Sequence, residues 1–163
     1  MNDFPAGQLD PIRRLHVMAA AIPGAAVAEG VLDARFDAVW EVASDLERGH
    51  EIEVLIRRVR IRSRQPDEAT GGERLELEVS PRPFGPRELI AVDLRPGWCW
   101  MQGRNSIAAM AARPEGDRTR FAHLEAVRVP GRRLFRPVIR AKMALAGELR
   151  RFERQARSRG PRN

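Results

Sequence analysis

Cysteine is almost absent from this chain of 163 residues, which contains only Cys99. One cysteine cannot form an internal disulfide, so a chain of this length must be held together by its apolar core. A lone thiol fits a reducing compartment, and we predict a cytoplasmic protein in which Cys99 lies unreactive in a strand. A nucleophilic cysteine would need a neighbouring base and an exposed position.

Long apolar runs are also absent. None approaches the roughly 18 residues that a membrane span requires, so we predict no span. Residues 15–28 follow two arginines and end in Ala26-Val27-Ala28, which resembles a signal-peptidase site. Pro23 and Gly24 interrupt this run, and cleavage would remove half of a strand that the fold needs. We therefore predict an N-terminal extension over residues 1–22, with a short helix over residues 11–21.

Histidine is scarce, and His16, His50 and His123 stand in three different segments. None has a second histidine or a cysteine at ligand spacing, so we predict no metal site. The chain also lacks a phosphate-binding loop, a dinucleotide fingerprint and the Gly-x-Ser-x-Gly motif. We accordingly expect no cofactor.

Lysine occurs once, against 28 arginines, in a chain of net charge +7. Residues 132–163 carry 11 basic and two acidic residues, a net +9, and the remaining residues sum to −2. Such a segment can contact nucleic-acid phosphates, or it can be a solvated helix face with a basic tail over residues 158–163. No nucleic-acid-binding motif is present, so we favour the solvated face and do not expect nucleic acid as a partner.

The most regular pattern in the chain is the apolar spacing near its end. Residues at intervals of three and four would share one face of a helix over residues 132–157. They are Val138, Ala141, Leu145, Leu149, Phe152 and Ala156. A helix with so narrow an apolar seam needs a partner surface.

The first half of the chain predicts a strand followed by two short helices. Residues 25–32 form the strand, and Asp33 is placed to cap the helix that follows. That helix carries apolar side chains at i, i+3, i+4 and i+7, from Phe36 to Ala43. A second short turn covers residues 45–48, and Gly49 can end it in a left-handed conformation.

From residue 53 the period changes to two, which indicates strands with alternating faces. The clearest strands cover residues 74–79, 88–94, 98–103, 107–112 and 119–129, and the last is followed by Pro130-Gly131. Polar turns are predicted at 65–72 and 114–117. Short connections of this kind favour an antiparallel meander.

The stretch from Val31 to Glu47 resembles a family pattern. It has a strand ending in Asp33-Ala34, a helix containing Val39-Trp40, and then Ser44-Asp45-Leu46-Glu47. Together with the terminal helix, it resembles the START-like superfamily, also called SRPBCC, which includes polyketide cyclase/dehydrase-like proteins. Arg35 stands where members often have proline, and residues 48–51 replace a loop that often contains tryptophan and proline.

The resemblance implies an α+β helix-grip fold. In that fold a curved antiparallel sheet of about seven strands surrounds a long C-terminal helix, with two short helices after the first strand. The domain would cover residues 23–157 and enclose an apolar cavity. Members bind lipids, sterols, polyketides, quinones or plant hormones, and some cyclise polyketides. The pattern is a fold signature, so no catalytic residue can be carried over.

Eight side chains are expected near the cavity: Leu77, Ile90, Trp98, Trp100, Met110, Phe121, His123 and Leu145. His123 could act as an acid or base there, oriented by Glu125 on the same strand face. The opposite face, which carries Ala122, Leu124 and Ala126, is an equally good inner face by periodicity. The two tryptophans could stack on a ligand or fill the cavity.

Three functions follow from these observations. The favoured one is binding of a hydrophobic small molecule, such as a lipid, a polyketide or a quinone-like compound. The second is a cyclase or dehydrase that acts in the same cavity through His123. The third is docking of a partner on the arginine-rich helix. The sequence does not decide whether a reaction is catalysed, nor the oligomeric state.

Overall fold

The computed structural model describes residues 9–51, 56–81, 86–127 and 147–159. Leu145 and the first part of the predicted helix over residues 132–157 lie outside them. The same is true of most of the predicted tail over residues 158–163. Docking of a partner on the arginine-rich helix therefore stays a prediction.

The elements follow the predicted order. The chain begins with α1 (Pro11–Ala21), β1 (Ala26–Leu32), α2 (Phe36–Ser44) and the 3-10 helix η1 (Leu46–Glu51). Six strands follow: β2 (Ile56–Asp67), β3 (Gly72–Pro81), β4 (Glu88–Arg95), β5 (Trp98–Gln102), β6 (Ser106–Glu115) and β7 (Arg118–Val127). The last element described is α4 (Gly147–Arg159). None of the helices in the described part of the chain is long and apolar enough to cross a membrane.

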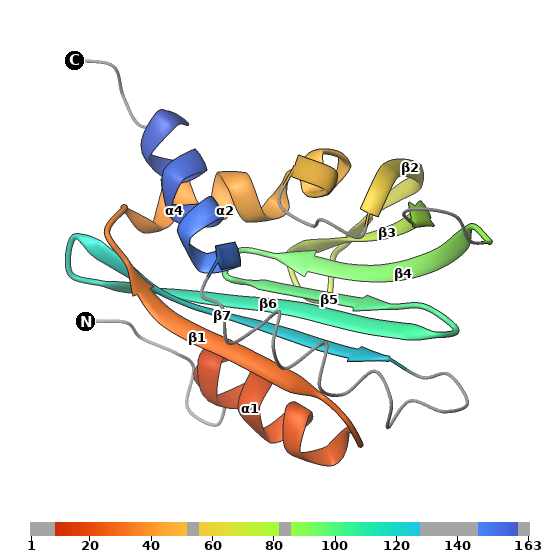
Figure 1. Ribbon diagram of the computed structural model, residues 1–163, viewed down its shortest axis with the longest axis horizontal. Coiled ribbons are helices and arrows are strands. Elements are labelled where there is room, and N and C mark those ends of the chain that lie inside the picture. The colour runs from red at the N-terminus through yellow and green to blue at the C-terminus, as the bar shows by residue number, and fades with distance from the viewer. Residues whose placement is uncertain (1–8, 52–55, 82–85, 128–146, 160–163) are drawn as a thin grey trace.

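The strands form one seven-stranded antiparallel sheet in the order β1-β7-β6-β5-β4-β3-β2. Strands β2 to β7 form a meander, and β1 joins the far edge by pairing with β7. Figure 1 shows the sheet curving beneath α2 and α4, with α1 on its opposite side. This arrangement confirms the predicted α+β architecture, a curved sheet with a C-terminal helix against it.

The two faces of the sheet bury different cores. Cross-strand pairing places Cys99, Met110 and His123 side by side on the face beneath α2 and α4, the inner face. The residues next to these in the sequence, such as Trp98, point to the opposite face, which lies beneath α1 and is called the outer face. Successive residues of a strand point to opposite faces, so burial of both faces produces strands that are apolar throughout.

Contacts along the length of α4 hold it against β7, β1 and the residue that follows β1. Phe152 packs against Phe121 of β7 with ring centroids 4.7 Å apart. Gly30 of β1 allows close approach, because a Cβ at that position would lie 3.1 Å from the Leu149 side chain. Near its C-terminal end, Arg157 donates from Nε to the backbone carbonyl of Asp33 at 3.1 Å.

Two predicted caps around α2 are wrong. The N-cap residue is Arg35, which makes no side-chain cap bond, and the Asp33 carboxylate instead pairs with Arg157. The turn before α2 is held by Thr119, whose buried hydroxyl donates to the Ala34 carbonyl at 2.8 Å. Gly49 lies inside η1 and does not end it. The first error arises because a tertiary contact with Arg157 replaced the local cap at Asp33.

Two predicted turns are shorter than expected because the strands extend into them. β2 reaches Asp67, and Pro66 is accommodated because β2 is an edge strand. β6 reaches Glu115, and a two-residue loop leads into β7 with Gly116 at φ 63°. The left-handed conformation at Gly116 is typical of tight hairpins.

α1 lies within the predicted N-terminal extension and is packed against the sheet. Its Leu15 is fully buried and belongs to the same cluster as Trp98 and Leu124. Asp10 caps the helix by accepting from the backbone N–H groups of Ile12 and Arg13 at 2.9 and 3.1 Å.

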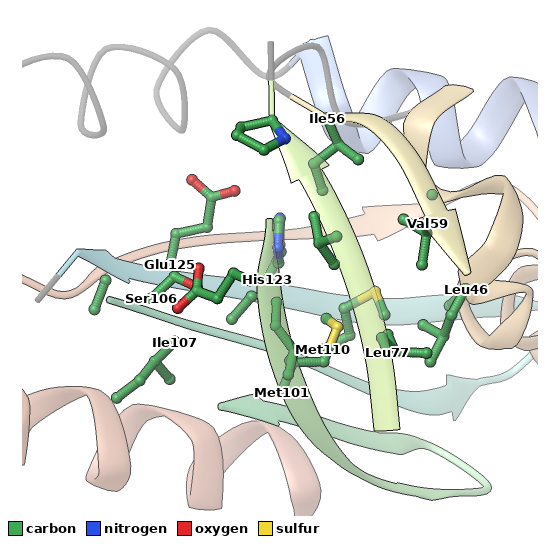
Figure 2. Close-up of a pocket in the computed structure, with 18 of the residues that line it drawn as sticks. Leu46, Ile56, Val59, Leu77, Met101, Ser106, Ile107, Met110, His123 and Glu125 are labelled. Atoms are coloured by element: carbon green, nitrogen blue, oxygen red, sulfur yellow. The ribbon is translucent and has the colours of Figure 1, made fainter. Parts of the chain in front are cut away.

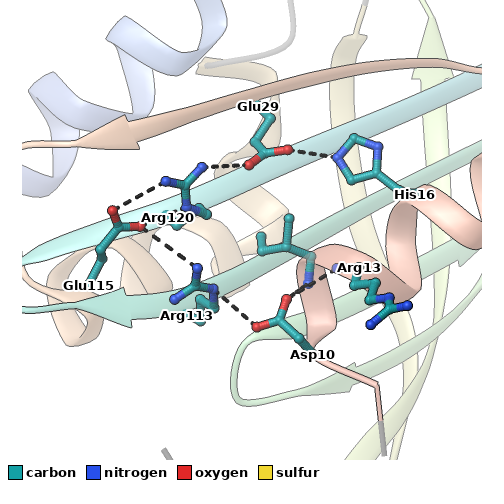
Figure 3. Close-up of polar contacts among 8 residues, drawn as sticks. Asp10, Arg13, His16, Glu29, Arg113, Glu115 and Arg120 are labelled. Carbon is teal, nitrogen blue, oxygen red and sulfur yellow. Dashed lines mark hydrogen bonds and ion pairs between the residues drawn. The ribbon is translucent and has the colours of Figure 1, made fainter.

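Ion pairs then connect α1 and its cap to the outer face of the sheet (Figure 3). They form an outer-face network of six residues: Asp10, His16, Glu29, Arg113, Glu115 and Arg120. At its centre, Arg120 bonds Glu115 at 2.6 Å and Glu29 at 2.8 Å.

Candidate functional site

The candidate site is a pocket between the inner face of the sheet and the helices above it. We call it the sheet–helix pocket, and its volume is about 300 Å³. Its helix-side lining is Val42, Ala43, Asp45, Leu46, Gly49 and Phe152. Its strand-side lining is Ile56, Val59, Leu77, Val79, Pro81, Glu88, Ile90, Met101, Ser106, Ile107, Ala108, Met110, His123, Glu125, Ala126 and Val127.

Most of this lining is apolar. Three of the predicted apolar cavity residues, Leu77, Ile90 and Met110, are in it. They come from β3, β4 and β6, whose alternate residues point to the inner face. Figure 2 shows Met101 and Met110 meeting near the middle of the pocket. Methionine adapts to irregular shapes, so this wall can adjust to more than one ligand.

The polar groups gather mainly at one end. Figure 2 shows Glu125 and Ser106 at this end, next to His123. His123 is 3% exposed, and Glu125, two residues further along β7, is half-buried. A polar end on an apolar pocket is the arrangement that orients a ligand.

The hydrogen-bond partner of His123 is a residue that the sequence did not suggest. His123 Nδ1 lies 3.0 Å from Glu148 Oε2, and both side chains are almost fully buried. Glu148 stands in the first turn of α4, four residues before Phe152, so the two share a helix face. The one feature of the sequence that could have indicated this role is that Glu148 is an acidic residue on the apolar seam of the helix.

The predicted ambiguity of the last strand is thereby resolved. Phe121, His123 and Glu125 point to the inner face, where Phe121 packs behind the pocket without lining it. Ala122, Leu124 and Ala126 belong to the cluster beneath α1, although Ala126, near the end of β7, also borders the pocket. Periodicity could not identify the inner face of this strand, because α1 buries the outer face as fully as α2 and α4 bury the inner face.

Comparison with known proteins gives a structural answer only. The chain matches no protein-family model and no curated protein sequence. A solved structure from Thermus thermophilus is similar, with a TM-score of 0.61 and 15% identity over 84% of this chain and 99% of that chain. The Zhui aromatase/cyclase of a Streptomyces strain has a TM-score of 0.58 and 18% identity over 85% and 98%. A START superfamily protein from Mycobacterium smegmatis has a TM-score of 0.53 and 17% identity over 82% and 97%.

The chain has the START-like helix-grip fold. The matched structures are covered almost completely, so the likeness extends over the whole fold and not one motif. Identities below 20% carry no residue roles, and the site of this chain has to be judged from its own side chains.

The placement of the tryptophans differs from the sequence prediction. Trp98 and Trp100 stack on each other with centroids 6.4 Å apart, but they do so on the outer face. Trp98 is packed with Leu15 of α1 and lies under the Arg14 guanidinium, 4.4 Å from the ring centroid. Neither ring lines the pocket, so they neither fill it nor stack on a ligand within it. The physical reason is the phase of β5, which turns Cys99 and Met101 inward.

Glu88 organises a second polar contact at the pocket lining. Its Oε1 accepts from the Asn105 backbone N–H at 2.6 Å, and its Oε2 accepts from the Ser106 hydroxyl at 3.0 Å. These bonds fasten the connection between β5 and β6 to β4. A Cβ on Gly103 would overlap the Glu88 carboxylate, so a larger residue there would displace this side chain from its present position.

Cys99 lies on the inner face but does not line the pocket, and it is fully buried. Burial raises the pKa of its thiol far above the ordinary value, since the charged thiolate would be desolvated. These properties agree with the unreactive strand residue expected from the sequence.

Within the described residues, one set of side chains has the composition of a metal-ligand group. His123, Glu125 and Glu148 place one donor atom each within 4.8 Å of one another. The sequence pointed away from a metal because these ligands are carboxylates and a single histidine, spread over two distant elements.

Proposed function

We propose that this protein binds a hydrophobic small molecule in the sheet–helix pocket. The observation that carries the proposal is the pocket itself, with about 300 Å³ bounded mostly by apolar side chains. That volume is at the lower end of the range for ligand sites, roughly 300 to 1,000 Å³. It suits a compact ring system or a short acyl chain better than a large lipid.

The energetics of such a pocket are favourable. A ligand that loses about 200 Å² of apolar surface gains roughly 5 kcal/mol at about 25 cal/mol per Å². Association costs reduce this gain, so micromolar affinity requires the polar end as well. His123, Glu125 and Ser106 can orient a ligand oxygen there, while the methionines adapt to its body.

The structural comparisons support the proposal without naming a ligand. One similar structure is an aromatase/cyclase and another is a START superfamily protein. A polyketide-like or quinone-like aromatic molecule is therefore the first class to test. The cytoplasm stays the predicted compartment.

The direct test is native mass spectrometry of the protein purified from its host, followed by binding of an environment-sensitive apolar dye. Ala108 lines the pocket, and Ala108→Trp would place a large ring in it. Ala91 is an exposed position on β4 outside the lining, so Ala91→Trp is the matched control. We expect dye affinity to fall at least tenfold in Ala108→Trp only. Equal affinities in the three proteins would refute the proposal.

A second candidate function is proton-transfer catalysis on the bound molecule, of the cyclase or dehydrase type. The observation that favours it is the buried His123–Glu148 hydrogen bond beside an apolar pocket. A carboxylate fixes the orientation of an imidazole and stabilises its protonated form, so the ring can relay a proton.

The catalytic candidate is tested with aromatic polyketide precursors and Glu148→Gln. The amide keeps a hydrogen-bond acceptor but removes the negative charge. If His123 transfers protons, kcat falls by more than tenfold while dye affinity is kept. Turnover that survives in both Glu148→Gln and His123→Gln would exclude this function.

A further inference from the structure

Three side chains with metal-binding donors converge at the polar end of the pocket. His123 and Glu125 occupy alternate positions of β7 and therefore project from the same face. Glu148 approaches from the first turn of α4. One donor atom from each of the three lies within 4.8 Å of the other two.

The geometry is close to that of a facial ligand set. Neighbouring ligands of an ion with bonds of about 2.1 Å are roughly 3.0 to 3.4 Å apart. His123 Nδ1 and Glu148 Oε2 already have this separation, at 3.0 Å. Glu125 has a donor atom within 4.8 Å of both and is only half-buried, so a side-chain torsion can bring it to bonding distance of the ion. The ion would take the place of the proton in the His123–Glu148 bond.

We propose that His123, Glu125 and Glu148 bind one divalent transition-metal ion, Zn²⁺ or Mn²⁺. One imidazole and two carboxylates suit these ions better than Ca²⁺ or Mg²⁺, which take oxygen ligands almost exclusively. With a neutral imidazole and two carboxylates, a divalent ion brings the net charge of the group to zero. His123 and Glu148 are both nearly inaccessible to water.

The ion would face the pocket. His123 and Glu125 line the pocket, whereas Glu148, in the first turn of α4, is not one of its lining residues. Three protein ligands leave at least one coordination position for a ligand oxygen, as in open metal sites. A carbonyl or phenolate at the end of an apolar molecule is the class that would bind there. Only this last step rests on the proposed function, since cation binding itself does not require an apolar ligand.

The test is titration of chelator-stripped protein with Zn²⁺ and with Mn²⁺, followed by calorimetry. We expect one site per chain, at least tenfold weaker in Glu125→Gln and Glu148→Gln. Mg²⁺ at the same concentrations should not compete. Paramagnetic resonance of bound Mn²⁺ gives a second readout that does not depend on activity.

The control is a second histidine–carboxylate pair on the outer face. His16 Nε2 lies 2.7 Å from Glu29 Oε2, and His16 is about half exposed. His16→Ala should leave metal affinity unchanged.

The proposal is overturned if the unmodified protein binds neither ion stoichiometrically, if both glutamine variants bind like it, or if His16→Ala abolishes binding. Should Glu148→Gln fail to fold, Glu125→Gln decides alone. Dye binding by the stripped protein tests the apolar pocket separately.

Discussion

Replacement of Phe152 by alanine tests whether α4 is held on the sheet as described. Phe152 is 3% exposed, packs on Phe121 with centroids 4.7 Å apart, and also lines the pocket. Large-to-small substitutions of buried phenylalanine cost about 3 to 5 kcal/mol of unfolding free energy. One side of this ring already borders the pocket and lacks packed neighbours there. We therefore expect the low end of the range, about 3 kcal/mol.

The assay is reversible urea or thermal unfolding followed by circular dichroism. For a domain of this size each kcal/mol shifts Tm by about 2 to 4 °C, so Phe152→Ala should lower Tm by about 6 to 12 °C. Arg154 is exposed on the same helix, and Arg154→Ala is the control. It should change stability by less than about 0.5 kcal/mol. A loss below about 1 kcal/mol in Phe152→Ala would refute the reasoning, because α4 would then contribute little to the core.

Two further predictions concern groups with altered pKa values. Cys99 should resist alkylation in the folded protein at pH 8 and react readily in urea, since burial raises its thiol pKa; fast modification under native conditions would contradict its buried position. Glu29 has a lowered pKa, chiefly because Arg120 donates a hydrogen bond to it. Its contribution to stability is therefore present above the ordinary carboxyl pKa of 4.5 and is lost as the pH falls through the lower folded value. Unfolding free energies should separate Glu29→Gln from the unmodified protein at pH 6 and converge near pH 2, and a constant difference would exclude the linkage.

The local pattern of the chain predicted the elements well, because helix and strand periods depend on near neighbours. The helix after the first strand, the strands and the described part of the C-terminal helix follow from apolar spacing, and the meander follows from the short turns. The stretch from Val31 to Glu47 indicated the START-like fold. The capping of α2 was predicted wrongly, since Arg157, more than a hundred residues away, pairs with Asp33. Local hydrogen-bond rules cannot anticipate a partner from a distant helix.

The structure places only some of the side chains named from the sequence at the candidate site. Leu77, Ile90, Met110 and His123 line the pocket, because the alternation of their strands turns them to the inner face. Glu148 as the partner of His123 was missed, because nothing in a strand pattern points to the first turn of a helix 25 residues later.

By itself, the sequence determined the order of the elements, the antiparallel pairing of successive strands and the need for a surface to cover the terminal helix. Only the tertiary structure decided which face of each strand is the inner one. The reason is that α1 buries the outer face of β5, β6 and β7. Both faces of these strands are therefore apolar, and an alternation of apolar and polar residues cannot distinguish them. This assignment of faces places Trp98 and Trp100 beneath α1, and it places His123 in contact with Glu148 at the pocket.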